Sequence, residues 1–280
     1  MGPVKLGLNL EFVRYADKSF DWAVAAAADM GYEYVEPMVH WGRELLSAAG
    51  YFHTRSMLDD PLEVRATCEK HGVRISGLSS HAPLAKPDVS VDYLKQAVRF
   101  AKECGAPMVV TDDGPKPEWT SPEEDFMLMK YTLAETTPLA ERRDVTLAIE
   151  THGNYTNNPE RLQRVLDLST SPSVGINFDT GNAFLSGNDP AQWLGEILDN
   201  VVNIHAKDIP TDVAATMRGK INGMLGCACG EGVLDWEHIV GIAMKAPRDL
   251  VLSVECGSIE DAAKSYEHLS GVLLKLGKTS

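Results

Sequence analysis

The 280-residue chain is 44% hydrophobic and 24% charged, which is typical of a soluble globular protein and argues against disorder. Its formal net charge of −14 repels phosphate backbones, so we expect no broad binding to nucleic acid. The sequence has no apolar run of about 18 residues, and its five cysteines form no even disulfide framework, so we expect a cytoplasmic protein with no membrane partner.

Eight apolar segments rich in Val, Ile and Leu recur along the chain. Such continuous runs predict strands that are buried on both faces, as in a parallel sheet. The predicted strands span residues 5–12, 32–38, 73–81, 107–113, 145–153, 174–182, 201–208 and 250–257.

The segments between these strands carry helical spacing together with helix start and stop signals. Residues 17–31 and 90–105 each end on a glycine, and residues 120–133 begin with Ser121, Pro122 and two acids. No linker divides residues 1–280, so we expect one domain. Eight strand–helix units predict an α/β TIM (β/α)8 barrel, in which catalytic groups lie at the C-terminal ends of the strands. A doubly wound sheet is the alternative, but no Gly-rich phosphate turn follows the first strand.

Two connections on the catalytic side of such a barrel are long, at residues 39–59 and 209–232. Loops of this size most often serve as lids or substrate-binding segments, and a contact between subunits is the alternative. The second loop contains Cys227 and Cys229. This lone Cys-x-Cys pair lacks the second pair of a zinc ribbon, so packing within the loop is the simpler interpretation.

The sixth predicted strand, VGINFDTGN, contains Asp179, which could simply cap the following helix by accepting a backbone N–H. The neighbouring strands also end in polar residues, namely Glu150, His205 and Glu255. In a closed barrel the four side chains would meet at one rim, where three carboxylates repel one another unless a cation neutralises them. A divalent metal resolves this repulsion. The mostly oxygen ligand set suits Mn²⁺ best, or Mg²⁺, and Co²⁺, Fe²⁺ or Zn²⁺ can also occupy it.

The stretches AIETHG, INFDTGN, NIHAKD and SVECG carry these four residues in the order Glu, Asp, His, Glu. In this the chain resembles the xylose-isomerase-like superfamily, in particular the branch of ketose 3-epimerases, inosose dehydratases and isomerases, and sugar phosphate isomerase/epimerase proteins. Residues 230–236, GEGVLDW, are similar to a G-x-G-x-x-D-W stretch of that family. The resemblance covers essentially the whole chain. It implies Glu150, Asp179, His205 and Glu255 as metal ligands, with Glu150 and Glu255 also forming the acid/base pair of an epimerase.

Two features separate the chain from plain epimerases. Those relatives usually have a histidine three residues after the strand-6 aspartate, where this chain has Asn182. In Glu150-Thr151-His152 the i, i+2 spacing predicts that Glu150 and His152 share one side of a strand, so that His152 stands beside the metal. This E-x-H-G stretch resembles the metal-bearing subunit of C-glycoside deglycosidases, in which a histidine near the metal is implicated as base.

Epimerisation, dehydration and deglycosidation share a first step, in which a base removes a proton α to a carbonyl that a cation polarises. The leading hypothesis is a metal-dependent isomerase or epimerase of a keto-sugar or keto-cyclitol. The alternative is a lyase, either an inosose-type dehydratase or a C-glycoside deglycosidase acting on 3-keto-glycosides. The base would be Glu150, Glu255 or His152. An endonuclease IV-like phosphodiesterase is a remote alternative, against which the acidic balance and Asn182 argue.

Four side chains are candidates for substrate contact. His81 ends the third strand and Lys207 lies two residues beyond His205, although packing and a surface salt bridge are the respective structural alternatives. Asn182 takes the place of the sugar-orienting histidine, and Arg218 lies where relatives often hold a substrate-contacting arginine. Three lid residues could stack on a sugar or pack on the scaffold, namely Trp41, Phe52 and His53. His40 and Glu36 are weaker candidates. Glu11 and Asp112 also end strands, where they could meet the pocket or cap helices.

The resemblance also bears on assembly. Barrels of this kind frequently form dimers or tetramers, so we expect a homo-oligomer that binds a small carbohydrate. A small β-rich second subunit is expected in addition if the deglycosidase interpretation holds.

Overall fold

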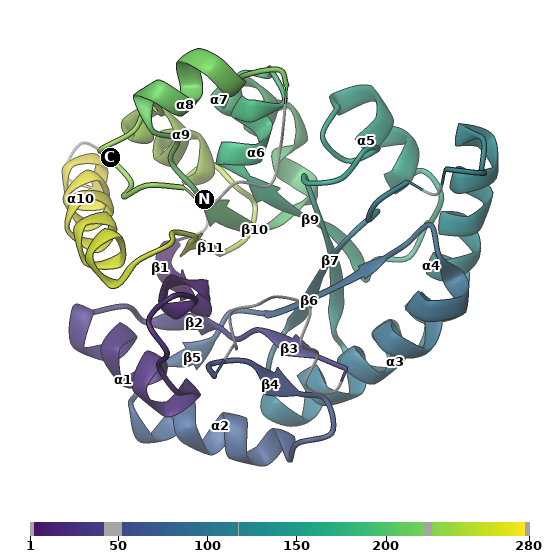
Figure 1. Cartoon of the computed structure of the whole chain (residues 1–280), viewed down its shortest axis with the longest axis horizontal. Coiled ribbons are helices and arrows are strands. Elements are labelled where there is room, and N and C mark those ends of the chain that lie inside the picture. Colours follow the sequence, from purple (N-terminus) through teal and green to yellow (C-terminus); the bar gives the residue numbers. More distant parts are fainter. Residues whose placement is uncertain (1–2, 42–51, 117, 221–225, 278–280) are drawn as a thin grey trace.

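The computed structural model describes residues 3–41, 52–116, 118–220 and 226–277. Its main sheet contains nine parallel strands in the order β5-β2-β1-β11-β10-β9-β8-β7-β6 (Figure 1). The strands are β1 (Val4–Asn9), β2 (Tyr34–Glu36), β5 (Arg74–Ile75), β6 (Leu78–Pro83), β7 (Met108–Asp112), β8 (Thr146–Glu150), β9 (Val174–Asp179), β10 (Val201–Ala206) and β11 (Leu250–Val254).

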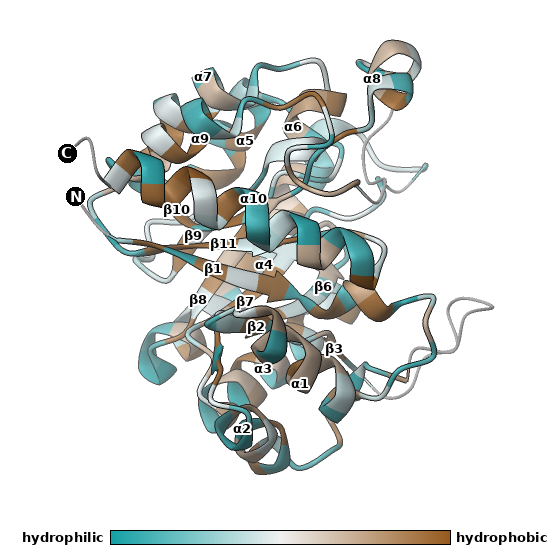
Figure 2. Ribbon diagram, turned by 90° about the vertical axis from the view of Figure 1, so that its left-hand side faces the viewer, coloured by the Kyte–Doolittle hydropathy of each residue, from teal (hydrophilic) through white to brown (hydrophobic). Residues whose placement is uncertain are grey.

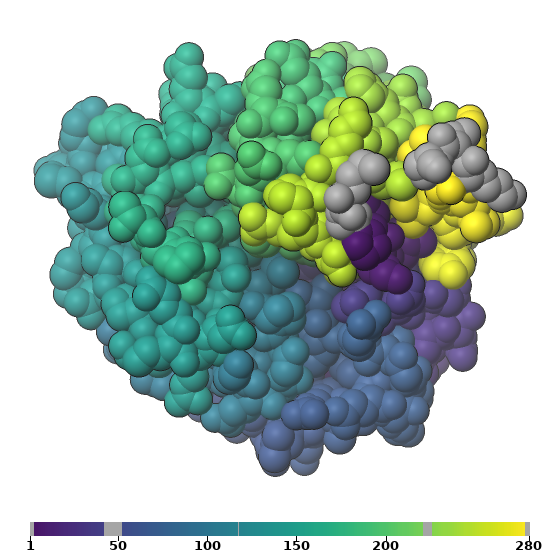
Figure 3. All heavy atoms as spheres, turned by 180° about the vertical axis from the view of Figure 1, so that it is seen from behind, coloured from purple at the N-terminus to yellow at the C-terminus, as the bar shows by residue number. Residues whose placement is uncertain are grey.

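The nine strands fill eight positions, because the third predicted strand is divided at Gly77. A Cβ at Gly77 would lie 2.7 Å from the Met108 side chain, so the chain passes too close to β7 for any other residue. β5 pairs with β2 on one side of the break, and β6 pairs with β7 on the other. A bridge between Met38 and Ser79 then closes the ring. Figure 3 shows the consequence, since the sequence colours run around the molecule until yellow meets purple. The predicted TIM barrel is therefore confirmed.

Helices surround the barrel, and their ends follow the signals in the sequence. The side chain of Ser121 accepts the Glu124 N–H while Glu124 accepts the Ser121 N–H, which caps the longest helix. Gly31 and Gly105 end their helices at φ of 102° and 86°. The helices are α1 (Phe20–Met30), α2 (Pro61–Lys70), α3 (Pro87–Cys104), α4 (Pro122–Arg143), α5 (Pro159–Leu166), α6 (Thr180–Leu185), α7 (Pro190–Ile197), α8 (Thr211–Met217), α9 (Trp236–Ala243) and α10 (Ile259–Gly277), with short 3₁₀ turns at Leu10–Val13 and Leu198–Asn200.

The apolar core lies between the strands and these helices. Figure 2 shows hydrophobic colouring at the centre, along strands such as β1 and β10, and hydrophilic residues on the outer helices. Leu8, Val35, Phe178 and Leu252 are fully buried there. Within the described residues, no helix combines the length and the apolar character that crossing a bilayer requires.

The two long connections are partly structured. The first contains a two-stranded ribbon of β3 (Val39–His40) and β4 (Arg55–Ser56), and the second contains α8. Residues 42–51 and 221–225 of these loops lie outside the described residues.

The carboxylate of Asp208 anchors the GEGVLDW stretch to the end of β10. It is fully buried and accepts hydrogen bonds from Gly230 N (2.9 Å), Leu234 N (3.1 Å) and Trp236 Nε1 (2.8 Å). A Cβ at Gly232 would lie 2.1 Å from Asp208 Oδ1, so this position requires glycine. The motif that resembles the family is thus the segment that surrounds one buried anion.

We expect Asp208→Ala to lower the free energy of unfolding by about 3 kcal/mol, because several buried N–H donors lose a charged acceptor. The matched control is Asp235→Ala, which removes only the side-chain cap on His238 N of α9 and should cost about 1 kcal/mol. Urea denaturation of both variants at neutral pH measures the difference. Equal losses would contradict the anchoring role of Asp208.

Candidate metal centre

Four side chains at the C-terminal ends of neighbouring strands meet at one point. Glu150 ends β8, Asp179 ends β9, His205 lies in β10 and Glu255 directly follows β11. Glu255 N donates to Ala206 O (3.0 Å), so its backbone continues the sheet by one residue. One ligand atom from each side chain lies within 4.8 Å of the other three. The convergence that the sequence predicts is therefore present.

Asp179 serves as both helix cap and site residue. Its Oδ1 accepts the Asn182 N–H (2.8 Å) and caps α6, which begins at Thr180. Its Oδ2 lies 2.8 Å from Lys207 Nζ on the side of the other carboxylates. The two interpretations of this strand end are thus compatible, because each uses a different oxygen.

His205 is held with its Nδ1 toward the carboxylates. Its Nε2 lies 2.9 Å from Glu36 Oε1, while Nδ1 lies 3.1 Å from Glu255 Oε2 and 3.3 Å from Glu150 Oε2. Glu36, a weak candidate in the sequence, therefore orients the imidazole from the opposite side. A carboxylate behind a histidine is the usual arrangement at protein metal sites.

Lys207 brings a positive charge into the cluster. The side chain is buried, and its Nζ lies 2.8 Å from both Asp179 Oδ2 and Glu255 Oε1. The sequence argument assigned this neutralisation to a metal, but the chain itself supplies one of the positive charges. The alternative prediction of a surface salt bridge at Lys207 is wrong, because the ammonium group is buried inside the barrel.

The electric field of this cluster shifts its pKa values strongly. Burial raises the pKa of Asp179 to about 6, although Lys207 opposes the shift. Burial acts in the same direction on Glu150, but the nearby charge of His205 holds the pKa of Glu150 at about 2. Burial disfavours charge on His205, yet Glu36 and Glu150 raise its pKa well above 6.5. The cluster thus demands more positive charge than Lys207 supplies.

The residues fit a divalent cation. Three carboxylates face one ammonium, and within the described residues neither Asp179 Oδ2 nor His205 Nδ1 makes a hydrogen bond of good geometry. Both residues belong to the group of four whose ligand atoms lie within 4.8 Å of one another. A divalent ion there would replace the proton on His205 Nδ1, since metal ligands bind deprotonated. Glu150, Asp179, His205 and Glu255 would hold it.

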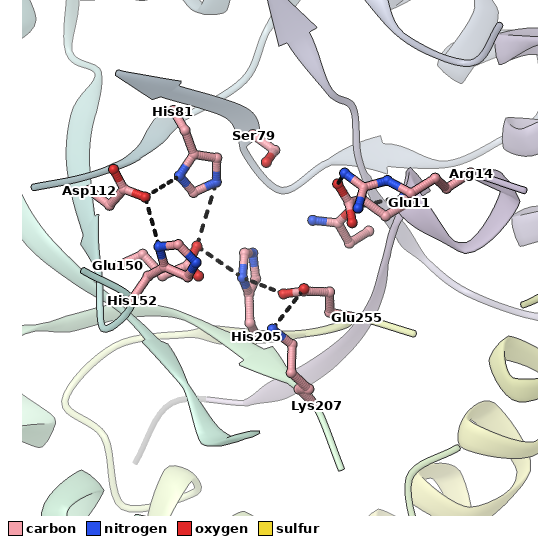
Figure 4. Close-up of a pocket in the computed structure, with 11 residues that line it drawn as sticks. Glu11, Arg14, Ser79, His81, Asp112, Glu150, His152, His205, Lys207 and Glu255 are labelled. Carbon is pink, nitrogen blue, oxygen red and sulfur yellow. Dashed lines mark hydrogen bonds and ion pairs between the residues drawn. The ribbon is translucent and has the colours of Figure 1, made fainter. Parts of the chain in front are cut away.

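A polar cavity of about 260 Å³ lies beside these groups (Figure 4). Arg14, which donates to Glu11 Oε1 (2.5 Å), was missed in the sequence. Arg14 lies three residues after Glu11. A basic residue at this distance from an acidic residue at a strand end is the sequence signal that could have identified it. The cavity is lined by Asn9, Glu11, Arg14, Ser79, His81, Asp112, Glu150, His152, His205, Lys207 and Glu255.

Two histidines share one carboxylate at the side of this cavity. Asp112 Oδ2 lies 3.3 Å from His81 Nδ1 and 3.0 Å from His152 Nδ1, and His81 Nε2 lies 3.6 Å from Glu150 Oε2 (Figure 4). Desolvation opposes charge on His81, but Asp112 and Glu150 raise its pKa to about 9. The sequence left open whether Asp112 meets the pocket or caps a helix, and the structure answers that it bridges both imidazoles.

His152 reaches the cavity by a different route from the one predicted. β8 ends at Glu150, and His152 N donates to Glu150 O (2.9 Å) in a tight turn. Both residues line the cavity, as the sequence predicted, but strand alternation is not the reason, because the strand ends before His152. The turn, rather than the strand, directs the imidazole toward Asp112.

The remaining candidates lie outside the cavity lining. Asn182 is buried behind it and donates to Glu150 Oε1 (3.3 Å). Arg218 follows α8, stacks on Phe184 at 4.4 Å and donates to Asn188 O (3.3 Å). The structure thus brings neither into the cavity. Trp41 and Phe52 are exposed and His53 is buried, and none of the three lines the cavity.

Cys229 is buried in the second long loop with its Sγ 3.4 Å from Ala206 O. Cys227 pairs through its backbone with Asp208. Packing, the simpler interpretation of this pair, is therefore what the structure contains, although the contacts join the loop to the end of β10 and the residues beyond it.

The fold and the site agree with the comparison to known families. Residues 24–275 match the family model described as xylose isomerase-like TIM barrel. The chain belongs to this family. Curated relatives of this xylose isomerase-like barrel include an uncharacterised protein of Methanocaldococcus jannaschii, 26% identical over 66% of this chain and 62% of that protein. Another is inosose dehydratase of Clostridium botulinum, 22% identical over 52% of each chain. The matches therefore span about half to three fifths of these relatives.

Solved structures resemble the barrel over nearly its whole length. A D-tagatose 3-epimerase-like protein has a TM-score of 0.76 at 19% identity, covering 98% of this chain and 99% of that one. The IOLI protein with a bound zinc atom has a TM-score of 0.72 at 15% identity, covering 97% of both chains. A family member from Mycobacterium smegmatis in complex with magnesium has a TM-score of 0.68 at 16% identity, again covering 97% of both.

Asp113 clamps the loop that carries His152. It is buried and accepts hydrogen bonds from Tyr155 N and from the Thr156 hydroxyl, both at 2.8 Å. A Cβ at Gly153 would lie 1.8 Å from Asp113 Oδ1, so the loop approaches as closely as glycine allows. Asp112 holds the imidazole of His152 while Asp113 holds the backbone that follows it.

We expect Glu150→Ala and Asp179→Ala to abolish stoichiometric Mn²⁺ binding, because each removes one of four converging donors. Glu36→Gln should weaken binding about 10–100-fold, because His205 loses the carboxylate behind it. Glu11→Gln is the matched control, since Glu11 lines the cavity outside the donor set. Titration calorimetry and elemental analysis measure the metal. Full Mn²⁺ occupancy in both alanine variants would refute the site.

We expect Asp113 to add a pH-dependent contribution to stability. Burial raises its pKa from 3.8 to about 6, against the hydrogen bonds from Tyr155 and Thr156. This contribution is complete below pH 3.8 and is lost as the pH rises through about 6, because the protonated carboxyl is the form that the fold favours. The unfolding free energy of the wild type minus that of Asp113→Asn should therefore increase from about pH 7.5 to about pH 5 in urea titrations. A constant difference would contradict the raised pKa.

Proposed function

We propose that the chain is a divalent-metal-dependent isomerase or epimerase that acts on a keto-sugar or keto-cyclitol. The observation that carries this proposal is the pair of carboxylates beside His205, with Glu255 and Glu150 at 3.1 Å and 3.3 Å from its Nδ1. Both line a cavity whose other side chains are also polar or charged. Such a cavity suits a small polyhydroxylated substrate.

The proposed reaction begins with loss of a proton α to a carbonyl. The divalent ion, when bound, polarises that carbonyl and stabilises the negative charge that develops on its oxygen. Glu150 or Glu255 accepts the proton, and the other carboxylate returns one on the opposite face in an epimerase or on the neighbouring carbon in an isomerase. Two glutamates from different strands, both beside His205 Nδ1, are the pair of groups that this exchange needs.

Neighbouring residues keep both carboxylates ionised and oriented. Lys207 contacts Glu255 Oε1, and its charge together with His205 holds the pKa of Glu255 below its usual range against the effect of burial. Asn182 and Asn177 each donate to Glu150 at 3.3 Å. Asn182 therefore supports the base from behind, whereas the sequence assigned it to the substrate.

A lyase is the second candidate, and the Asp112–His152 contact at 3.0 Å favours it. An imidazole paired with a carboxylate is a common acid/base unit, and its raised pKa, which Asp112 and Glu150 cause against desolvation, lets it carry a proton. In a dehydratase or deglycosidase, His152 would act on the same α-proton or on the leaving group. Inosose dehydratase among the relatives supports this class.

One assay separates the two candidates. The protein is incubated with Mn²⁺ in D₂O with a panel of keto-sugars, inososes and 3-keto-glycosides, and the products are analysed by NMR. We expect deuterium at the α-carbon with no loss of a group, and a loss of exchange of about 10²–10⁴-fold in Glu255→Gln, because a proton-transfer group is removed. Metal content is measured in parallel, because Glu255 is also a candidate ligand.

His152→Gln and a matched surface change, Glu160→Gln, complete the design. If the two glutamates form the acid/base pair, His152→Gln should retain exchange within about tenfold, and a drop of 10²-fold or more would favour the lyase. Release of water or an aglycone by the wild type would also favour the lyase. No exchange and no release with any member of the panel would refute both candidates.

A further inference from the structure

A second cavity of about 400 Å³ adjoins the polar cavity. The two share His81, Asp112 and His152 as common lining. Figure 4 shows these three side chains together at one side of the polar cavity, away from Glu11 and Arg14. The histidine pair therefore lies between two adjacent spaces.

The second cavity has a different chemical character from the first. Beyond the shared residues, it is lined by Ala82, Pro83, Gly114, Pro115, Gly153 and Asn154, none of which is charged. Two proline rings and three small residues offer apolar surface with few hydrogen-bond donors. Phosphate or carboxylate would gain little here, because the two imidazoles already face Asp112.

Buried hydrogen bonds hold the walls of the second cavity in place. On one side, Asp113 fixes the segment after His152 through Tyr155 N and the Thr156 hydroxyl. The Tyr155 hydroxyl donates in turn to Asp125 Oδ2 (2.5 Å), a buried carboxylate at the start of α4. On the other side, a Cβ at Gly114 would lie 2.3 Å from Pro83 Cβ, so these segments are in direct contact. The cavity is a feature of the packed structure rather than a gap between unattached loops.

The volumes of the two cavities can be compared with those of typical small-molecule sites. The polar cavity of about 260 Å³ is smaller than the roughly 300–1,000 Å³ of typical small-molecule sites, and the adjoining cavity of about 400 Å³ offers the additional space. Typical sites are mostly apolar with a few placed polar groups, and the second cavity supplies the apolar lining that the polar cavity lacks.

We infer that the substrate has two parts: a polar ring that occupies the first cavity, and a flat, largely apolar substituent on that ring that occupies the second. The substrate class is then a glycoside or ether of the keto-sugar or keto-cyclitol, carrying an aryl or similar group. This inference rests on the proposed function for the identity of the ring. It assigns the choice among substrates to Pro83, Pro115 and Asn154, which the proposed reaction does not use.

The test compares inert ligands that differ only in the substituent. Matched pairs of 4-nitrophenyl and methyl glycosides of D-glucose and D-xylose are titrated into the Mn²⁺-loaded wild type by calorimetry. We expect the 4-nitrophenyl member of at least one pair to bind tenfold or more tightly. Equal affinities within both pairs would overturn the inference.

Two substitutions locate the effect. Asn154 is exposed at the rim of the second cavity, so Asn154→Trp should narrow it and remove most of the preference for the aryl ligand. Glu160→Trp places the same side chain on the exposed first turn of α5, outside both cavities, and should keep the preference. Pro115→Glu, which introduces a charge instead of bulk, should also reduce it. An aryl preference that persists in both cavity variants would overturn the inference.

Failure of this inference can be distinguished from failure of the proposed function. Deuterium exchange into an unsubstituted ketose reports on the carboxylate pair and needs no occupant in the second cavity. Exchange without any aryl preference would retain the proposed function and reject the two-part substrate. An aryl preference without exchange on any ketose or glycoside would retain the second subsite and reject the proposed chemistry.

Discussion

The candidate site depends on the two ion pairs that the buried ammonium group of Lys207 makes with Asp179 and Glu255. A buried charge costs several kcal/mol unless it is paired, and here Nζ lies 2.8 Å from both Asp179 and Glu255. Asp179 ends β9, and Lys207 and Glu255 directly follow the two neighbouring strands β10 and β11. The same contact that makes the lysine tolerable therefore orients two carboxylates toward the common centre before any ligand is present.

Several polar side chains divide their atoms between the scaffold and the cavity. Asp179 caps α6 with one oxygen and faces Lys207 with the other. Asp112 and Asp113 are consecutive at the end of β7, where successive side chains point to opposite sides. One binds both imidazoles at the cavity, and the other binds the backbone beyond His152. Stability and chemistry thus depend on the same buried carboxylates.

The proposed chemistry and the proposed substrate preference belong to two adjacent cavities that share buried side chains. The polar cavity is surrounded by strand ends, which the barrel holds in fixed register. The apolar cavity is bounded by the end of β6 and by the segments after β7 and β8, and the hydrogen bonds of Asp113 and Asp125 hold the segment after β8. His81 and His152 stand where the two meet, so they are placed to sense both the ring and its substituent.

The sequence by itself determined the barrel and the meeting of Glu150, Asp179, His205 and Glu255, because parallel strands that follow one another in a closed sheet end at the same rim. Only the tertiary structure decided the break at Gly77, the buried position of Lys207 and the absence of Arg218 from the cavity lining. Strand ends follow from local periodicity. The other features depend on close approach between segments far apart in the chain and on the path of each turn, which no local pattern encodes.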